Sequence, residues 1–392
     1  MRARSIAWSL SLPLLLSSCF FYDSTWHQET QSQERQAAAL TPDAPRAEGA
    51  GDRWRATREL RVRAWATARY RAEVHGFRAH VRQLLDRSNE VLGPALGVRL
   101  VLEDARSWDA GDTDSLADLL EALEQHDAGD GADLVIGLAG STPRLAARFD
   151  TLGIARVHGK HLVVRAMNDA AESDAIDAAF DRLSDEERAR LRRRRKAHKE
   201  LAVLLHEIGH SHGAIHVRDT TALMSPIYDD AMVRFAPETI ALMRLAAEER
   251  RKPEAERDHR AFARAIADVL RADEHGFVPD ERDALLAHCE QVLTGGDTTP
   301  ATQRAAATRD DGPRTLNDVT ALPDDDRAAL ERVRETRGRT AWELLAPLVE
   351  RHPDSYAVHE LACELYHRRA APSEAARSCQ RMMDLASSYG AD

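Results

Sequence analysis

The stretch His-Glu-Ile-Gly-His-Ser-His-Gly-Ala-Ile-His at residues 206–216 decides the fold. His206 and His210 are four residues apart, so on a helix their side chains project from one face, one turn apart. Two imidazoles placed in this way can bind Zn²⁺. Gly213 permits the positive φ that ends a helix and reverses the chain, which would bring His216 back as a third ligand. Three protein ligands leave a fourth position open for water, as in catalytic zinc sites.

Glu207 directly follows the first histidine and supplies the carboxylate that such a site needs. On the helix it would lie close enough to contact a water at the open position without displacing it, so it is the candidate general base. The alternative is a helix with hydrogen-bonded core histidines. That alternative does not require Gly213 and His216 at these spacings. His212 is expected to be an exposed bystander.

The pattern resembles the elongated zinc motif of the metzincin metalloproteases. Shortly after the third histidine, the segment Ala-Leu-Met-Ser-Pro-Ile-Tyr at residues 222–228 resembles the methionine turn of this family, and most closely that of matrixins. The resemblance implies that Met224 forms an apolar floor below the metal. It also implies that the pocket for the residue after the scissile bond is walled by Pro226, Ile227 and Tyr228.

The same resemblance implies one catalytic Zn²⁺ ion and a protein or peptide substrate. The implied zinc ligands are His206, His210 and His216, with Glu207 as the base. Two matrixin features are not found in this sequence. No cysteine-switch propeptide is visible, and the stretch that binds structural zinc and calcium is not reproduced, because His158 and His161 alone are weak candidates.

Upstream of the motif, hydrophobic periodicity predicts a sheet with two earlier helices. Strands are predicted at residues 60–65, 98–102, 134–138 and 161–165. Helices are predicted at 77–92, where Gly93-Pro94 should end the helix, and from Leu116 to Leu123. The order β-α-β-α-β-β favours an α+β or α/β domain with a mixed sheet. With a capped helix after Phe235, this matches the twisted sheet, active-site helix and closing helix of metzincins.

The N-terminus has the features of an export signal. Met1-Arg2-Ala3-Arg4 is basic, and residues 6–16 are apolar but too few to span a bilayer. The segment ends in Leu-Ser-Ser-Cys, which resembles the bacterial lipoprotein box and implies lipidation of Cys19. An ordinary cleaved signal is the alternative. Phe20 stands where Asp would favour inner-membrane retention, so we expect an exported lipoprotein of the cell envelope, at the outer membrane or cell surface.

Composition excludes several classes of protein. With 43% hydrophobic and 30% charged residues the chain is neither collagen-like nor wholly disordered. A net charge of −11 argues against a general nucleic-acid binder, because phosphate contacts need a basic surface. The basic run at 192–196 lies in a charged insertion, residues 169–199, and is interpreted as a solvated helix face.

The chain after about residue 250 reads as helical. The pattern around Trp342, Leu344, Leu345 and Leu348, with a later proline, resembles a tetratricopeptide repeat, although an unspecific helical hairpin is the alternative. Cys363 and Cys379 could form a disulfide in an exported protein, or stay as buried thiols. The predicted divisions are a signal peptide (1–18), a disordered tether (19–52), a zinc protease domain (53–250), a helical linker (251–330) and a tetratricopeptide-like region (331–392).

The sequence therefore predicts an exported, lipid-anchored zinc endopeptidase with an α+β metzincin-like domain followed by an all-α C-terminal region. The alternative is an inactive metalloprotease-fold surface scaffold that binds a protein partner through its C-terminal helices. The intact Glu207 argues against the scaffold. Another zinc-dependent hydrolysis, such as deacylation, fits the ligands equally well, but the peptidase-like wall at residues 226–228 favours peptide cleavage.

Overall fold

The computed structural model describes nine stretches of the chain and two single residues. These are residues 12–46, 58–111, 113–141, 149–168, 170–273, 275–294, 322–336, 339–353 and 355–367, with residues 378 and 381. The described residues contain one five-stranded sheet, in the order β2-β1-β3-β5-β4. Its strands are β1 (Arg58–Ala66), β2 (Val98–Ser107), β3 (Leu134–Ala139), β4 (Gly153–Ala155) and β5 (His161–Arg165).

The predicted mixed sheet is confirmed. The pairs β1·β2, β1·β3 and β3·β5 are parallel, and β4 runs antiparallel to β5 at the end of the sheet. All four predicted strands are present, and β4 is an additional strand that the hydrophobic pattern did not reveal. β4 has three residues, too few to show an alternation of apolar and polar side chains.

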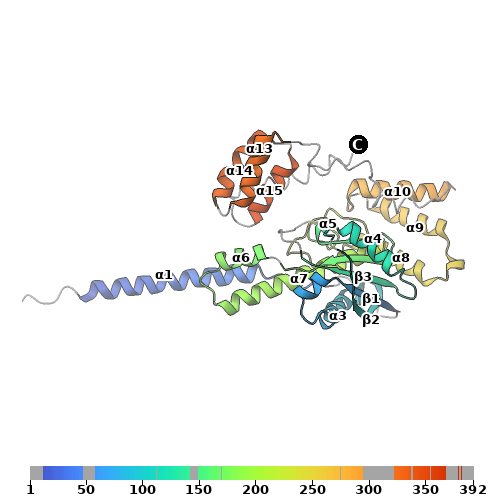
Figure 1. The fold of residues 1–392 in the computed structure, drawn as a ribbon, viewed down its shortest axis with the longest axis horizontal. Coiled ribbons are helices and arrows are strands. Elements are labelled where there is room, and N and C mark those ends of the chain that lie inside the picture. The colour runs from blue at the N-terminus through green and yellow to red at the C-terminus, as the bar shows by residue number, and fades with distance from the viewer. Residues whose placement is uncertain are drawn as a thin grey trace, which may run out of the picture.

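Helices cover both faces of the sheet, which is why β3 is apolar on both sides. The helices around the sheet are α2 (Ala68–Glu73), α3 (Phe77–Leu96), α4 (Leu116–His126), α5 (Phe149–Leu152), α6 (Ala170–Ala179) and α7 (Asp185–Ser211). Leu134, Ile136 and Leu138 join the core formed with α3 and α7. Val135 and Ala139 alternate with them and join a second core with α4. The sheet is therefore the middle layer of three (Figure 1).

The end of α3 differs from the prediction. The helix continues through Gly93 and Pro94 and ends at Leu96. Proline removes one backbone hydrogen bond and its ring crowds the carbonyl four residues earlier, but only Ala95 and Leu96 follow it in the helix. The helix stops instead at Gly97, whose φ of 68° is the left-handed conformation that closes many helices.

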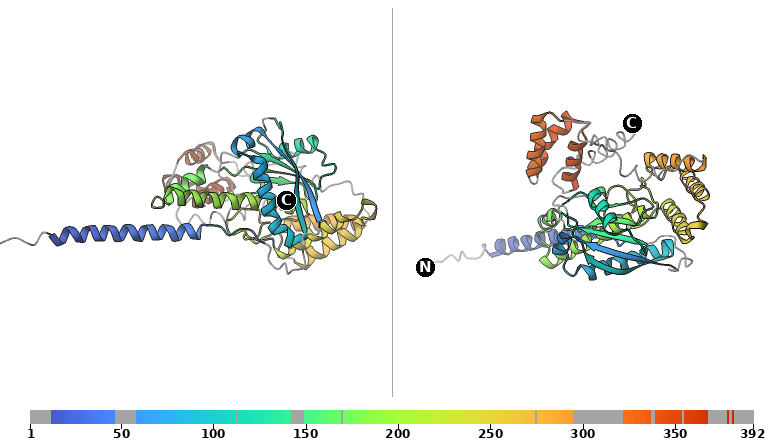
Figure 2. Two further views of the ribbon diagram at one scale, coloured as in Figure 1. Left: turned by 90° about the horizontal axis from the view of Figure 1, so that it is seen from below. Right: turned by 45° about the vertical axis from the view of Figure 1, so that its right-hand side comes forward.

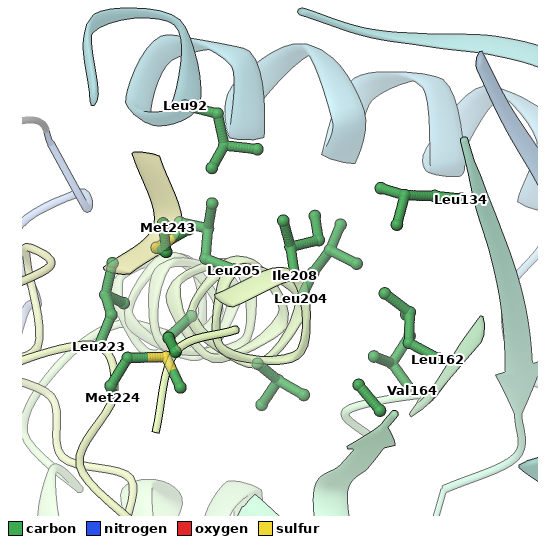
Figure 3. Close-up of a cluster of buried hydrophobic side chains, with 14 of the residues drawn as sticks. Leu92, Leu134, Leu162, Val164, Leu204, Leu205, Ile208, Leu223, Met224 and Met243 are labelled. Atoms are coloured by element: carbon green, nitrogen blue, oxygen red, sulfur yellow. The ribbon is translucent and has the colours of Figure 1, made fainter. Parts of the chain in front are cut away.

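Helix α7 carries the zinc motif at its C-terminal end. The helix begins with a capping box between Ser184 and Glu187, and its second half is deeply buried. In Figure 3, Leu205 points toward Leu92 of α3, and Ile208 lies between α3 and the sheet. This packing fixes the last turns of α7, so the side chains of His206 and His210 start from a rigid element.

The polypeptide after α7 adds further helices to the same core. These are α8 (Pro237–Arg251), α9 (His259–Ala272) and α10 (Pro279–Thr294), with a 3-10 turn at Glu254–Glu256. The predicted capped helix corresponds to α8, which begins at Pro237. Leu270 and Phe277 are fully buried in the core that α7 and the sheet share. The division predicted at residue 250 therefore does not follow the hydrophobic core, since α9 and α10 pack into it.

Residues 12–39 form helix α1 (Leu12–Ala39), although much of this stretch was predicted to be a disordered tether. The sequence from Trp26 to Ala39 is rich in Gln, Ala and Glu, which favour helix. The C-terminal part of α1 also has partners. Gln33 hydrogen-bonds Asp181 and the Arg182 amide, and Ala37 packs on the apolar cluster of α6 and α7. The N-terminal part of α1 projects away from the domain (Figure 2).

Three C-terminal helices form a separate apolar core. They are α13 (Asp324–Glu335), α14 (Arg339–Arg351) and α15 (Tyr356–His367) (Figures 1 and 2). Leu345 and Leu348 are buried in this core, Trp342 packs against it, and Leu344 is exposed. The tetratricopeptide likeness remains a prediction. Cys363 is disulfide-bonded, and Cys379 lies outside the described residues. None of the described helices is long and apolar enough to cross a membrane.

Candidate metal centre

The end of α7 reverses the chain as its sequence predicts. Gly213 has φ of 83°, and its N–H and that of Ala214 return to carbonyls of the last helical turn. Gly213 is needed for a second reason. A Cβ at this position would lie 2.0 Å from Cε1 of His158, so the turn and the histidine ring pack without room for a side chain. The reversal brings His216 back beside the helix.

The three predicted ligands converge. His206 Nε2 lies 3.0 Å from His210 Nε2 and 3.3 Å from His216 Nε2. The Nδ1 atoms of His206 and His210 face backbone carbonyls of Leu223 and Ala214, at 2.7 and 2.9 Å. A carbonyl can only accept, so these Nδ1 atoms carry the hydrogens and the Nε2 lone pairs point at one another. Three Nε2 lone pairs that converge in this way form a donor set that a divalent cation can bind.

The spacing suits zinc. Three nitrogens at about 2.0–2.1 Å from a tetrahedral ion are about 3.3 Å apart, close to the separations seen here. Within the part of the chain that the structure describes, these three histidines form the one group of three or more His, Cys, Asp or Glu side chains that could hold a metal. His158 and His161 belong to no such group there. His161 instead bonds the Asp127 carbonyl at 2.7 Å through Nε2.

Burial keeps two of these imidazoles neutral. It lowers the pKa of His206 well below its ordinary value, and the neighbouring His210 and His216 lower it further. Burial, followed by the charge of His216, lowers the pKa of His210 to about 4. Both rings are therefore deprotonated at neutral pH and present the lone pairs that a metal requires.

Glu207 lies at the junction of α7 and the edge strand β4. The residue is buried, and its side chain passes over Gly153 at the start of β4. A Cβ on Gly153 would be 2.6 Å from Glu207 Oε1 and 2.7 Å from its Cγ. The absence of a side chain at Gly153 thus makes the space that the Glu207 carboxyl group occupies.

Met224 packs against α7 at Gly209 and is not one of the three converging side chains. It is fully buried, and its Sδ would be 2.4 Å from a Cβ at Gly209, so only glycine allows this approach. The preceding carbonyl, that of Leu223, orients His206. The Met224 carbonyl accepts from the Val217 amide at 3.0 Å, which ties the turn to the segment after His216. The role of Met224 as an apolar floor below a metal stays a prediction.

The predicted pocket wall lies close to the first ligand. Pro226 is exposed, and Ile227 and Tyr228 are half-buried. The Tyr228 hydroxyl lies 2.8 Å from His198 Nδ1 and 3.1 Å from Asp230 Oδ1, so the tyrosine is fastened to α7 and not to the ligand group. The role of these three residues in a substrate pocket stays a prediction.

Phe149 is a neighbour of the site that the sequence did not reveal. Its ring stacks on the His206 imidazole, with centroids 3.8 Å apart and planes 3° from parallel. Its amide donates to the Pro226 carbonyl at 3.2 Å, and its ring meets Tyr228 edge-on at 6.2 Å. Phe149 therefore covers one face of the first ligand and joins it to the predicted wall.

Glu281, on α10, is a second neighbour that the sequence did not reveal. Its Oε1 lies 2.5 Å from His216 Nδ1, and its Oε2 accepts from the His216 amide at 2.9 Å. The only local signal is an acidic first turn after Pro279, which marks a helix start and says nothing of a metal.

The exposure expected for His212 was wrong. His212 is 2% exposed, with Nδ1 2.9 Å from the Ile208 carbonyl and close to the Ser211 hydroxyl. Burial and the nearby Arg250 lower its pKa to about 3. His212 is the C-cap residue of α7. The chain reverses directly after it, at Gly213, and this reversal encloses the His212 side chain.

Comparison with known proteins agrees with this geometry. A sequence model of the Matrixin family of peptidases (Peptidase_M10) matches residues 88–238, less than half of the chain. The matched interval includes the three histidines, Glu207 and Met224, and it stops before Glu281. The fold is metzincin-like. The match also supports the general assignment of this chain as a metallopeptidase, and peptidases of the Matrixin type generally depend on zinc.

Two solved structures show slight likeness to the chain. Archaemetzincin from Methanopyrus kandleri has 16% identity and a TM-score of 0.33, with 51% of this chain and 98% of that protein covered. Metalloproteinase-II from Bacteroides fragilis has 13% identity and a TM-score of 0.31. The likeness covers 53% of this chain and 56% of that protein. No curated protein matches the chain.

Proposed function

We propose that this protein is a zinc-dependent endopeptidase in which Glu207 is the general base. The convergence of three Nε2 atoms carries this proposal: that of His206 lies 3.0 Å from His210 Nε2 and 3.3 Å from His216 Nε2, and the ligand atoms all lie within 4.8 Å of one another. His206, His210 and His216 would hold the ion, and the buried Glu207 follows the first of them on the same helix. A purely structural zinc site would be closed by a fourth protein ligand, and the described residues offer three.

Bound zinc would lower the pKa of a water toward about 7 and polarise the scissile carbonyl. The carboxylate of Glu207 would take the proton of the attacking water and return it to the leaving amine. His206 and His210 have their Nδ1 hydrogens on backbone carbonyls and would have Nε2 on the metal, so neither ring would have a nitrogen free to take up a proton. The proton would therefore move through Glu207 and not through the ligands.

The edge strand supports a polypeptide substrate. β4 is the last strand of the sheet, and its first residue, Gly153, lies against Glu207. An extended peptide can add to such an edge through main-chain hydrogen bonds, which recognise any sequence. A peptide paired with β4 would pass directly by Glu207. This favours cleavage within a chain over hydrolysis of a small amide.

Replacement of Glu207 by Gln tests the proposal. The amide keeps the size of the side chain but cannot accept the proton, so cleavage of an unstructured protein should fall by at least about 10²-fold. Zinc should stay near one ion per chain, since Glu207 is not a ligand. Hydrolysis at the wild-type rate in this variant would rule the mechanism out. Loss of zinc along with activity would make Glu207 structural.

We also propose that the protein is exported and anchored by lipid on Cys19. Cys19 lies on α1, and residues 19–39 of that helix would act as a spacer of about 30 Å between lipid and domain. The contacts of Gln33 with Asp181 and Arg182 would hold the spacer in one direction. Labelling with a fatty acid in a bacterial host should require Cys19, and a Cys19→Ser variant that is still labelled would refute the anchor.

A further inference from the structure

The third ligand has a different support from the other two. His206 and His210 are oriented by backbone carbonyls, whereas His216 is held by the carboxylate of Glu281. Both carboxylate oxygens are used, Oε1 with ring Nδ1 at 2.5 Å and Oε2 with the backbone N–H at 2.9 Å. One side chain therefore fixes the ring and the main chain of the same ligand.

His216 lies in a more exposed and less anchored position than His206. Its side chain is 22% exposed and follows a turn, while His206 is 1% exposed and sits on a packed helix. An exposed imidazole can rotate about χ1 and χ2 and present either nitrogen. A carboxylate on Nδ1 selects the tautomer with its hydrogen on Nδ1 and leaves Nε2 free for the metal.

Glu281 is itself held in place by main-chain pairing. The residues just before it run alongside the segment that follows His216. Val278 donates to the His216 carbonyl at 3.0 Å, and Arg218 donates to the Gly276 carbonyl at 2.8 Å. Phe277, between the two contacts, forms a bridge with Val217 and is fully buried. The first turn of α10 thus has a fixed register relative to His216.

We infer that Glu281 is a positioning residue of the zinc site, and that the α9–α10 pair is part of the catalytic unit. The inference rests on the proposed zinc-dependent function. Glu281 lies outside residues 88–238, the interval that matches the Matrixin family, so this chain supplies the support from its own later helices. Glu281 would act through His216, since the structure places its carboxylate on Nδ1 and the metal-facing nitrogen is Nε2.

Zinc affinity of the full chain tests the inference. Apo protein is titrated with Zn²⁺ against a chromogenic chelator for the wild type, Glu281→Ala and Glu281→Gln. Loss of an outer partner of a metal-ligating histidine weakens metal binding by about 10–100-fold, and we expect this for Glu281→Ala. Gln has one carbonyl oxygen for two N–H groups, so it should restore part of the affinity.

Glu290 provides a matched control on the same helix. It is exposed and pairs with Arg271 far from the ligands, so Glu290→Ala should bind zinc within about twofold of wild type. The visible spectrum of the Co²⁺-loaded protein gives a second readout, since a reoriented His216 changes the ligand field. Far-UV circular dichroism of each apo protein checks the fold. If Glu281→Ala does not fold, the Gln variant decides.

The outcomes separate this inference from the proposed activity. Zinc affinities within twofold of wild type for both Glu281 variants, or an equal loss in Glu290→Ala, would overturn the positioning role. A loss of at least tenfold in Glu281→Ala with an intermediate Gln variant would support it. A wild-type chain that binds zinc but cleaves no peptide would refute the peptidase alone and leave the role of Glu281 in metal binding intact.

Discussion

Three glycines set the clearances around the site. Gly209 admits the Met224 sulfur, Gly213 admits the His158 ring, and Gly153 admits the Glu207 carboxyl group. Of these, Gly153 has the most direct bearing on chemistry, because the atoms that a new Cβ would meet belong to the proposed base. The clash would involve Cγ as well as Oε1, so rotation of the carboxylate alone would not relieve it.

Gly153→Ala should therefore displace Glu207 and slow the reaction. A shift of about 1 Å in a reacting group can cost about 10²-fold in rate, and we expect a loss of that order in kcat. Zinc affinity should stay unchanged, because the ligands do not contact Gly153. Peptide kinetics together with metal titration checks this. Wild-type kcat in the Ala variant would show that the carboxylate has room to move.

At the scale of the element, α7 combines two different environments. Its N-terminal half is charged and solvated, as predicted, although Arg188, Arg192 and Arg195 are paired with acidic neighbours. Its C-terminal half is buried, and Glu200 lies where the two meet. Glu200 is 3.5 Å from His80 Nε2 and 3.8 Å from Lys196 Nζ, with Tyr70 and Arg87 also close.

Glu200 should make stability depend on pH. Burial raises its pKa from 4.5 to about 7, against the opposing charges of Lys196 and Arg87. Between pH 4.5 and 7 the folded state binds more protons than the unfolded state, so the unfolding free energy falls as pH rises. Glu200→Gln should remove this penalty. Its free energy of unfolding relative to that of the wild type should therefore rise by on the order of 2–3 kcal/mol from pH 5 to pH 8.

Denaturant unfolding of the apo proteins at both pH values measures the difference. Glu186→Gln is the control, because Glu186 is on the same helix but 79% exposed. Comparing variant with wild type at each pH cancels the titration of all other groups. A difference that is constant from pH 5 to pH 8 would contradict the buried, raised carboxyl group.

Several elements could not be predicted from local pattern. β4 is short and carries a glycine, and α3 passes through Gly93 and Pro94 because the cost of one lost bond is small near its end. The helical state of α1 depends on its composition and also on tertiary contacts. Gln33 bonds Asp181 and Arg182 in the link between α6 and α7, and Ala37 packs on the nearby apolar cluster. Such docking is invisible in the sequence because the partners are far apart along the chain.

At the scale of the whole molecule, the catalytic unit extends to α10. Removal of α9 and α10 would take away Glu281. It would also take away Leu270 and Phe277 and expose the surfaces against which they pack, and the burial of each of these side chains contributes about 1.5–3 kcal/mol to stability. The helices α13–α15 have their own core and share no cluster with the sheet among the described residues.

Two truncations test this boundary. A chain that ends at residue 294 should keep its fold and bind zinc, and one that ends at residue 250 should lose both. Circular dichroism and zinc content per chain measure the outcome. Stable, zinc-loaded protein ending at residue 250 would show that α9 and α10 are dispensable. Loss of zinc from the longer chain would mean that the C-terminal helices also support the site.

The sequence by itself determined the helix that carries His206, Glu207 and His210, the turn that returns His216 to it, and the central sheet. The spacing of His206 and His210 and the turn at Gly213 are local properties of a helix and its end, and β1 and β3 follow from hydrophobic periodicity. Only the tertiary structure decided that Glu281 holds His216, that Gly153 makes room for Glu207, and that the core continues through α10. These depend on contacts between segments far apart in sequence, whose register no local pattern encodes.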